Sequence, residues 1–267
     1  MFIDLHTHTT CSDGTLTPEA LVQYAKEKKL RAVAVTDHDT VSGNGRALKE
    51  GETIRMEIVP GVELSAECDK GTMHILGFFI DSRNSTLKKV TAYLQKKRRE
   101  RNLKILEKLL DQGMYIESDD FLENAYLGRP HIAHKMVQSR YTSSIEEAFQ
   151  KFLKKGESAY VNREKLSEKE TLETIVKAGG VPVLAHPVTV FNPEKTIEKL
   201  IPLGLKGIEV YYPTHSLKDT ECYKKLAQKY DLVMTGGSDF HGSHKPDIDL
   251  GCMNVPAHLL DALKEIK

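Results

Sequence analysis

Short apolar runs recur along the chain at a spacing that predicts strands. Residues 31–36, Arg-Ala-Val-Ala-Val-Thr, form a nearly continuous apolar run, which is typical of a strand buried on both faces of a parallel sheet. The other runs are equally short and rich in β-branched or aromatic residues. Seven strands are therefore expected, at residues 2–5, 31–36, 57–64, 73–79, 181–185, 207–211 and 232–235.

Helices are predicted between several of these strands. Thr17 supplies an N-cap, Pro18 a first helical residue and Glu19 an acidic first turn, which predict a helix to about residue 29. Further helices are expected at residues 167–178, 193–201 and 218–230. Strands that alternate with helices of this length predict a parallel α/β sheet with helices outside it, either open or closed as a barrel.

The pattern changes in the middle of the chain. Strand-like runs are lacking between residues 82 and 158, where charged, helix-favouring sequence dominates. We interpret residues 82–158 as a helical insertion, or cap domain, within a barrel formed by residues 1–81 and 159–267.

Composition narrows the range of functions. The 38 basic and 38 acidic side chains give zero formal net charge, so no global field draws the protein to a polyanion or a membrane. No apolar run approaches the length of a membrane span, and the N-terminus does not resemble a secretion signal. The separated residues Cys11, Cys68, Cys222 and Cys252 are expected to be buried free thiols. These features predict a soluble, cytoplasmic protein, with no membrane association and no stable protein partner.

Ionisable side chains stand at or just beyond the ends of six predicted strands. Because the carboxyl ends of parallel strands meet at one face, residues far apart in sequence can converge there. His6 and His8 lie two residues apart, so in an extended chain both can face one cation. The candidates from the other strands are Asp13, His38, Glu63, His74, His186, Asp239 and His241.

These nine residues together indicate a metal site. Any one histidine is more often a hydrogen-bonded core or surface residue, but chance would not place so many ionisable groups at the ends of apolar strands. Nine are too many for one tetrahedral ion, so two or three ions are expected. Imidazole and carboxylate donors suit manganese, iron or zinc better than calcium. Asp37 and Asp39 are expected to form turns or orient imidazoles.

Five motifs resemble those of the PHP family, named for polymerase and histidinol phosphatase. They are Asp4-Leu-His-Thr-His-Thr-Thr-Cys-Ser-Asp-Gly, Val35-Thr-Asp-His-Asp-Thr, Pro60-Gly-Val-Glu-Leu-Ser, Val183-Leu-Ala-His-Pro and Gly237-Ser-Asp-Phe-His-Gly. The resemblance implies a distorted (β/α)7 TIM-like barrel, with the nine residues as metal ligands and Glu63 bridging two ions. Asp13, the helical insertion and Gly128-Arg-Pro-His131 resemble the subgroup with the nucleoside 3′,5′-bisphosphate phosphatase and the 5′-to-3′ RNA-trimming exonuclease.

The expected activity is metal-dependent hydrolysis of a phosphoester. A metal-bridging hydroxide is expected to attack phosphorus, with Glu63 holding the ion pair and a metal-bound water or a nearby histidine protonating the leaving oxygen. Glu63, Asp13 and His186 are the expected catalytic residues. The expected substrate is a phosphomonoester of a small nucleotide, such as a nucleoside 3′,5′-bisphosphate, or the 5′ end of a short phosphorylated RNA.

Substrate contacts are expected from five further residues. Arg129 stands at a helix start, where its guanidinium and exposed backbone donors can meet an anion. His215 follows the sixth strand and is expected to donate to a phosphate. Arg98 and Arg101 lie in a basic run, 96–101, for which a solvated helix face is the alternative. The family resemblance implies that Arg98, Arg101 and His131 contact the substrate. For His131, the three-residue spacing from His134 is also compatible with a role in helix packing.

Two other classes of function remain open. Metal hydroxides also attack carbonyls, so an amidohydrolase-type hydrolase is one alternative. A non-catalytic, metal-stabilised binding module is the other, although every expected ligand position is filled.

Overall fold

The computed structural model describes residues 1–124 and 127–267, with only the backbone at residue 123. The chain forms two compact units, one of Met1–Thr91 with Leu166–Lys267 and the other of Ala92–Lys165. Each is described by itself. The division expected from the sequence, with boundaries at residues 82 and 158, stays a prediction.

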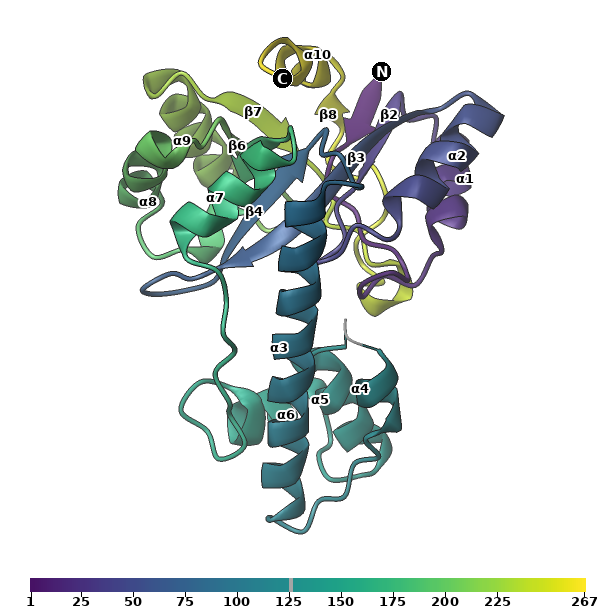
Figure 1. The fold of residues 1–267 in the computed structure, drawn as a ribbon, viewed down its shortest axis with the longest axis vertical. Coiled ribbons are helices and arrows are strands. Elements are labelled where there is room, and N and C mark those ends of the chain that lie inside the picture. Colours follow the sequence, from purple (N-terminus) through teal and green to yellow (C-terminus); the bar gives the residue numbers. More distant parts are fainter. Residues whose placement is uncertain (125–126) are drawn as a thin grey trace. The chain divides into compact units, whose positions relative to one another are not determined.

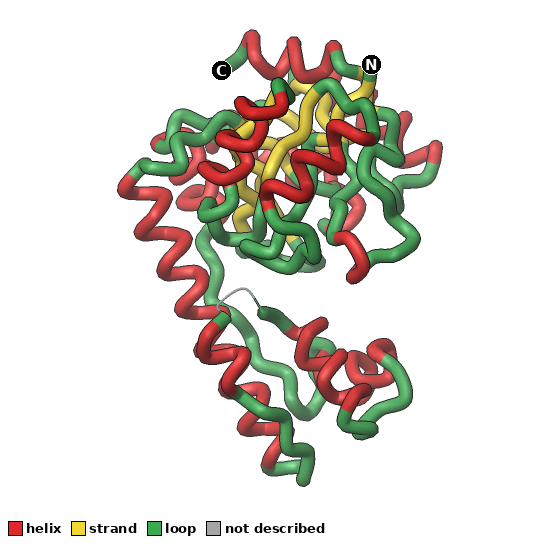
Figure 2. The backbone as a smooth tube through the Cα atoms, turned by 90° about the vertical axis from the view of Figure 1, so that its right-hand side faces the viewer, coloured by secondary structure: helices red, strands yellow, loops and turns green. Residues whose placement is uncertain are grey.

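The first unit contains an eight-stranded sheet surrounded by helices (Figures 1 and 2). The seven predicted strands are present with small shifts at their ends, and a two-residue eighth strand was not predicted. In sheet order the strands are β7, β6, β5, β4, β3, β2, β1 and β8. Their bounds are β1 Phe2–Asp4, β2 Ala32–Val35, β3 Glu57–Ala66, β4 Met73–Phe78, β5 Val181–Leu184, β6 Gly207–Tyr211, β7 Val233–Gly236 and β8 Val255–Pro256.

Two strands do not follow the expected parallel pattern. Parallel pairing joins β1 to β2, β2 to β3, β5 to β6 and β6 to β7. Strand β4 is antiparallel to both β3 and β5, and β8 is antiparallel to β1. The connection from β3 to β4 spans residues 67–72, which is too short for the crossover that a parallel pair needs. The parallel prediction was therefore wrong for β4, and β8 was not predicted.

The sheet curls so that β1 and β7 meet at one end. The Leu5 amide donates to the Gly236 carbonyl at 3.1 Å, and the His8 amide donates to the Phe240 carbonyl at 2.9 Å. Thr7 and Phe240 also form an isolated parallel bridge. This seam makes the sheet a nearly closed barrel, and the predicted distorted TIM-like fold is confirmed.

Helices flank the barrel on two sides, with α1 and α2 on one and α7, α8 and α9 on the other (Figure 1). The predicted cap is present, since the Thr17 hydroxyl accepts a hydrogen bond from the Ala20 amide at 3.2 Å. Helices α2 and α10 were not predicted. The helix bounds are α1 Pro18–Glu27, α2 Asn44–Ile54, α7 Glu168–Lys177, α8 Pro193–Leu200, α9 Leu217–Lys229 and α10 His258–Glu265, with 3-10 turns at Pro187–Thr189, Ile201–Leu203 and Gly242–His244.

The barrel interior is filled by alternate side chains of its strands. Ile3, Leu76 and Val183 come from three strands and are fully buried in one cluster. A second apolar cluster, which includes Leu21 and Val33, packs α1 against the outside of the sheet. Burial of each such side chain contributes about 1.5–3 kcal/mol. Apolar packing therefore fixes the strands whose ends carry the polar residues.

The second unit is helical. Helix α3, Ser85–Leu110, begins within the first unit and continues into the second. The other helices are α4 Asp119–Glu123, α5 Arg129–Gln138, α6 Ile145–Ala148 and a π-helical turn at Phe149–Leu153. Their apolar faces form a separate core that includes Ile105, Phe121 and Ile132.

None of the helices in residues 1–124 and 127–267 combines the length and the apolar composition of a membrane span. The four cysteines are free, as predicted, but none is buried: Cys11 and Cys68 are half-buried, whereas Cys222 and Cys252 are exposed. Burial was a wrong prediction because all four lie in loops or on outer helix faces rather than on the inner faces of strands.

Candidate metal centre

The barrel delivers all nine expected ligands to one end. His6 and His8 follow β1, His38 follows β2, and Glu63 lies near the end of β3. Because β4 runs in the opposite direction, its second residue, His74, pairs with Ser65 of β3 at that same end. His186 follows β5, Asp239 and His241 follow β7, and Asp13 comes from the loop after β1.

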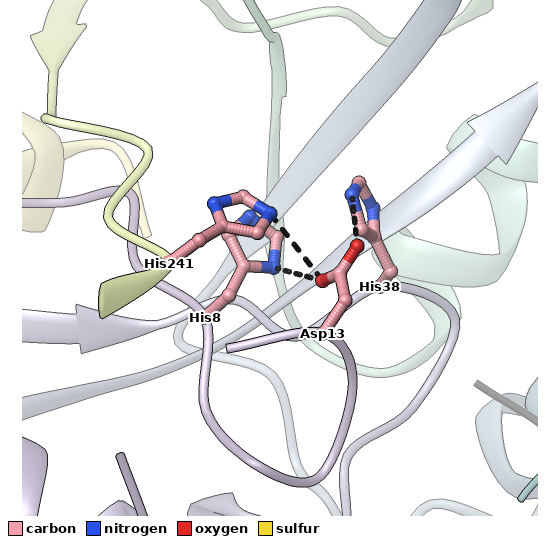
Figure 3. A group of neighbouring side chains, drawn as sticks. All are labelled: His8, Asp13, His38 and His241. Carbon is pink, nitrogen blue, oxygen red and sulfur yellow. Dashed lines mark ion pairs between the residues drawn. The ribbon is translucent and has the colours of Figure 1, made fainter. Parts of the chain in front are cut away.

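Potential ligand atoms of these nine residues form four groups, within each of which every atom lies less than 4.8 Å from the others. Figure 3 shows one group, in which the Asp13 carboxylate faces three imidazoles. Its Oδ1 is 3.6 Å from His8 Nδ1 and 3.4 Å from His241 Nε2. The groups are His8, Asp13, His38 and His241; His6, Glu63 and His186; His6, His8 and Asp239; and His38, Glu63 and His74.

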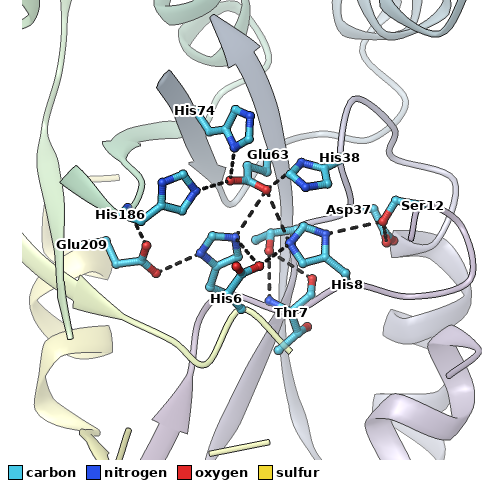
Figure 4. Close-up of polar contacts among 12 residues, drawn as sticks. His6, Thr7, His8, Ser12, Asp37, His38, Glu63, His74, His186 and Glu209 are labelled. Carbon is cyan, nitrogen blue, oxygen red and sulfur yellow. Dashed lines mark hydrogen bonds and ion pairs between the residues drawn. The ribbon is translucent and has the colours of Figure 1, made fainter. Parts of the chain in front are cut away.

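Glu63 lies at the centre of the cluster, with each carboxylate oxygen facing a different set of imidazoles (Figure 4). Oε1 is 2.9 Å from His74 Nδ1 and 3.0 Å from His186 Nε2. Oε2 is 2.7 Å from His38 Nδ1 and 3.4 Å from Nε2 of both His6 and His8. A carboxylate placed in this way can serve two ligand groups at once.

The donor set fits divalent cations. Four buried atoms, His6 Nε2, His8 Nε2, Asp13 Oδ1 and Glu63 Oε2, form no hydrogen bond with any described residue. Buried polar atoms normally have a partner, because an unsatisfied one costs about 1–3 kcal/mol. Imidazole nitrogens and carboxylate oxygens directed at one another are the ligands that transition metals prefer.

The Glu63 carboxylate is held in its ionised form. Burial by itself would raise the pKa of Glu63, but the neighbouring His38, His74 and His6 imidazoles outweigh burial and hold that pKa well below its usual range. An ionised carboxylate is the form that ligates a metal.

Two imidazoles are held in their neutral form. Burial, with the nearby His241 and His38, lowers the pKa of His8 to about 3. Burial likewise lowers the pKa of His74 to about 4, despite the opposing charge of Glu63. Neutral imidazoles have the free lone pair that a metal ligand needs.

Glu209, on β6, orients His6 and was not predicted. Its Oε1 is 2.9 Å from His6 Nδ1, and its Oε2 accepts the His186 amide at 2.7 Å. Burial opposes protonation of His6, yet Glu209, Glu63 and Asp239 together raise its pKa well above the usual value. Glu209 lies within an apolar strand, Gly-Ile-Glu-Val-Tyr, and a lone carboxylate in such a run was the available signal.

Asp37 and Asp39 hold the loops around the cluster. Asp37 accepts hydrogen bonds from the Thr9 amide at 2.7 Å and from the Ser12 hydroxyl at 2.6 Å. Asp39 accepts the Ser65 amide at 2.9 Å. The predicted turn role is therefore present, and Asp37 is linked to an imidazole through Ser12, whose hydroxyl lies 3.4 Å from His8 Nδ1.

Asp239 has two further neighbours that the sequence did not single out. The Tyr212 hydroxyl donates to Oδ2 at 2.9 Å, and the Lys245 ammonium donates to the same oxygen at 2.6 Å. The other oxygen, Oδ1, lies 3.1 Å from His8 Nε2 and 3.6 Å from His6 Nε2. Two donors on one oxygen thus orient the other toward the cluster.

His215, which is expected to donate a hydrogen bond to a phosphate, packs against Tyr212. The His215 and Tyr212 ring centroids are 5.2 Å apart. His215 Nδ1 is 2.9 Å from the Val210 carbonyl, which can only accept, so Nδ1 carries the proton. Burial lowers the pKa of His215, which favours the neutral ring and leaves Nε2 as an acceptor. Donation to a phosphate stays a prediction that requires a protonated ring.

The other expected substrate contacts lie in the second unit. Arg98 and Arg101 are only 9% and 8% exposed, so the alternative of a solvated face was wrong for these two arginines. Burial, together with the charges of Arg163, Arg98 and Arg129, lowers the pKa of Arg101 well below its usual value. Arginines so close together would be stabilised by an anion.

Arg129 and His131 are engaged in the structure of α5. Arg129 Nη1 donates to the Leu153 carbonyl at 3.0 Å, and its guanidinium lies 5.6 Å from the centre of the Tyr160 ring. The Gly128 amide donates to His131 Nδ1 at 3.1 Å, which caps the helix. These contacts hold both side chains at the N-terminus of α5; their expected role in substrate binding stays a prediction.

Comparison with known proteins identifies the family. The PHP domain matches residues 4–179, which is more than half of the chain, and the chain therefore belongs to the PHP family. This agrees with the resemblance seen in the motifs.

Three curated relatives cover nearly the whole chain. The phosphoribosyl 1,2-cyclic phosphate 1,2-diphosphodiesterase of Eggerthella lenta is 30% identical, over 91% of this chain and 95% of that protein. The 5′-3′ exoribonuclease Rnm of Escherichia coli is 32% identical, over 93% and 87%. The 3′,5′-nucleoside bisphosphate phosphatase of Chromobacterium violaceum is 31% identical, over 93% and 90%.

A solved structure has the same fold. The putative metal-dependent phosphoesterase of Bifidobacterium adolescentis superimposes with a TM-score of 0.88 at 30% identity, over 98% of this chain and 94% of that one. With the family, the relatives and the cluster of potential ligands, this defines the protein as a metal-dependent hydrolase of phosphoric esters.

Proposed function

We propose that this phosphoesterase removes a phosphate from a small nucleotide, such as a nucleoside 3′,5′-bisphosphate. The observation that carries the chemistry is Glu63, whose two oxygens each face a separate set of imidazoles. The nucleotide substrate is favoured by similarity to the bisphosphate phosphatase and by zero net charge, which suits a short ligand better than long nucleic acid. Trimming of short 5′-phosphorylated RNA is the second candidate, favoured by similarity to the exoribonuclease.

The nine clustered residues are proposed to hold two or three ions of manganese, iron or zinc. Glu63 would be shared between ions, and Asp13, with His8, His38 and His241, would provide the third position. Bound divalent ions would activate water and neutralise charge on the phosphate oxygens.

The protein's own side chains have distinct proposed roles. Glu63 keeps the ligand groups together, and Asp13 orients the imidazoles that face it. Glu209 holds the proton of His6 on Nδ1, which leaves Nε2 free as a ligand. His186, whose Nε2 faces Glu63 and whose Nδ1 is 3.0 Å from the Thr189 hydroxyl, is proposed to act with these residues in catalysis. A water or a nearby histidine protonates the leaving oxygen.

Arg98, Arg101, Arg129 and His131 are proposed to bind anionic groups of the substrate, with His215 as a further contact. The support is the accumulation of buried guanidinium groups, whose mutual repulsion a phosphate would relieve.

We also propose a cytoplasmic location, because free cysteines suit a reducing compartment.

One assay tests the activity. The manganese-loaded protein is incubated with adenosine 3′,5′-bisphosphate and with a 5′-phosphorylated oligoribonucleotide. Release of inorganic phosphate from the first is expected, and release of mononucleotides from the second would support RNA trimming. Lack of turnover of both, with hydrolysis of a phosphoester outside the nucleotides, would reject the proposed substrates. Hydrolysis of amides alone would favour an amidohydrolase. Metal binding without turnover of any substrate would favour a non-catalytic binding module.

A further inference from the structure

Lys245 places a positive charge against the metal-ligand cluster. Its ammonium contacts Asp239 Oδ2 at 2.6 Å, while the side chain remains 36% exposed. No PHP motif quoted above extends to this residue, which lies beyond Gly242 in the loop after β7. Lys245 therefore lies at the solvent-exposed rim of the cluster.

The backbone that carries Lys245 is held by the Asp13 loop. The Ser243 amide donates to the Thr15 hydroxyl at 3.0 Å, and His244 Nδ1 is 2.9 Å from the Asp13 carbonyl. Gly242 has a φ of +64°, and a Cβ there would lie 2.0 Å from Thr15 Oγ1. This close approach requires glycine at residue 242. It holds the start of the Lys245 loop against the loop that carries Asp13.

Orientation of Asp239 does not by itself account for a lysine. The Tyr212 hydroxyl already donates to Oδ2, and it is neutral. Burial and the Asp239 charge raise the pKa of Tyr212, so the hydroxyl keeps its proton. A cation beside Asp239 would compete with divalent ions for that carboxylate, since like charges repel. A lysine at this position has a role if a second anion, besides Asp239, binds at the cluster.

We propose that Lys245 binds a phosphate oxygen of the substrate at the rim of the metal centre. The inference rests on the proposed phosphoesterase function and adds a residue to it. Lysine suits the task because its ammonium is a compact charge on a flexible four-carbon stem, which can turn from Asp239 to a nearby anion without movement of the backbone. Asp239 holds the ammonium near the cluster until phosphate binds.

The test measures the binding of inorganic phosphate as well as turnover. Lys245→Ala and Lys245→Arg are compared with Lys225→Ala, an exposed lysine of α9 outside the cluster. In the manganese-loaded Lys245→Ala protein we expect phosphate to bind about tenfold more weakly by calorimetry and KM to rise about tenfold. The manganese stoichiometry should be unchanged and the manganese affinity equal or higher, because the competing cation is gone. Lys245→Arg should recover part of the phosphate affinity, and Lys225→Ala should match the wild type.

Other outcomes overturn the proposal. Weaker manganese binding with unchanged phosphate affinity would make Lys245 a positioning residue for Asp239. Equal phosphate binding by the wild type and Lys245→Ala, or no phosphate binding by either, would also refute it. Circular dichroism and thermal melts identify a variant that has lost its fold, in which case Lys245→Arg decides. Failure of the phosphoesterase function itself is distinguishable, since the wild type would then turn over no phosphoester while phosphate binding was still measured.

Discussion

Glu209 lies 2.9 Å from Nδ1 of His6, although 203 residues separate the two in sequence. The same carboxylate accepts the backbone amide of His186 through its other oxygen. One buried side chain thus orients an imidazole from the segment after the first strand and the loop after the fifth. Its position ties together residues that the sequence places in separate motifs.

Replacing Glu209 with glutamine should weaken metal binding about 10- to 100-fold. The amide oxygen can still accept from His6 or from the His186 amide, but the NH2 group then faces the other donor. Manganese titration by calorimetry measures the effect. Glu221→Gln, an exposed carboxylate of α9, is the matched control. Unchanged manganese affinity in Glu209→Gln would reject the orienting role.

Glu63→Gln should abolish turnover while leaving the protein folded. An amide has one oxygen, so it can no longer serve the imidazoles on both sides, and its NH2 group faces one of the sets. Phosphate release is expected to fall below detection, and the metal content to fall with it. A thermal melt checks the fold. An active variant with full metal content would contradict the bridging role.

Metal loading should release a proton and strengthen as pH rises. Neighbouring carboxylates raise the pKa of His6 well above its usual value, so the empty site holds a proton that a metal ion must displace. Below that raised pKa, each displaced proton makes the apparent affinity about tenfold higher per pH unit. Calorimetry in two buffers with different ionisation enthalpies measures the number of protons. A pH-independent affinity between pH 6 and 7.5, without proton release, would be inconsistent with this prediction.

Arg98 and Arg101 of the second unit should affect substrate binding. In Arg98→Gln/Arg101→Gln, KM for a nucleoside 3′,5′-bisphosphate should rise about tenfold or more, because charge-assisted contacts to phosphate are lost. At Arg101 the loss of charge should not lower the melting temperature, since burial and the charges of Arg163, Arg98 and Arg129 disfavour a charged Arg101. Lys96→Gln, at an exposed position of the same helix, is the control. An unchanged kcat/KM would exclude a substrate role.

The sequence predicted the parts of the fold that depend on local pattern. Apolar runs located seven strands, and the cap at Thr17 located the start of α1. The nine ionisable residues came together because strand ends converge geometrically, whatever the length of chain between them. Helix α2 was not predicted because its Asn-Gly start and Gly51 weaken the helical pattern of the sequence.

Features that depend on long-range contact could not be predicted from the same patterns. The direction of β4 follows from a short connection between strands rather than from its own residues. Glu209 resembles any polar residue in an apolar strand until its contact with His6 is known. The burial of Arg98 and Arg101 depends on tertiary packing, which a run of charged residues does not reveal.

The seam between β1 and β7 has a consequence for biosynthesis. His6, His8, Asp13, His38, Glu63 and His74 leave the ribosome before the helical unit, whereas His186, Asp239 and His241 follow it. A nascent chain that has not reached Phe240 lacks the partner that closes the barrel against Thr7. The full set of ligands can therefore assemble only after His241 has left the ribosome, and uptake of metal at the complete centre would report that the barrel has closed.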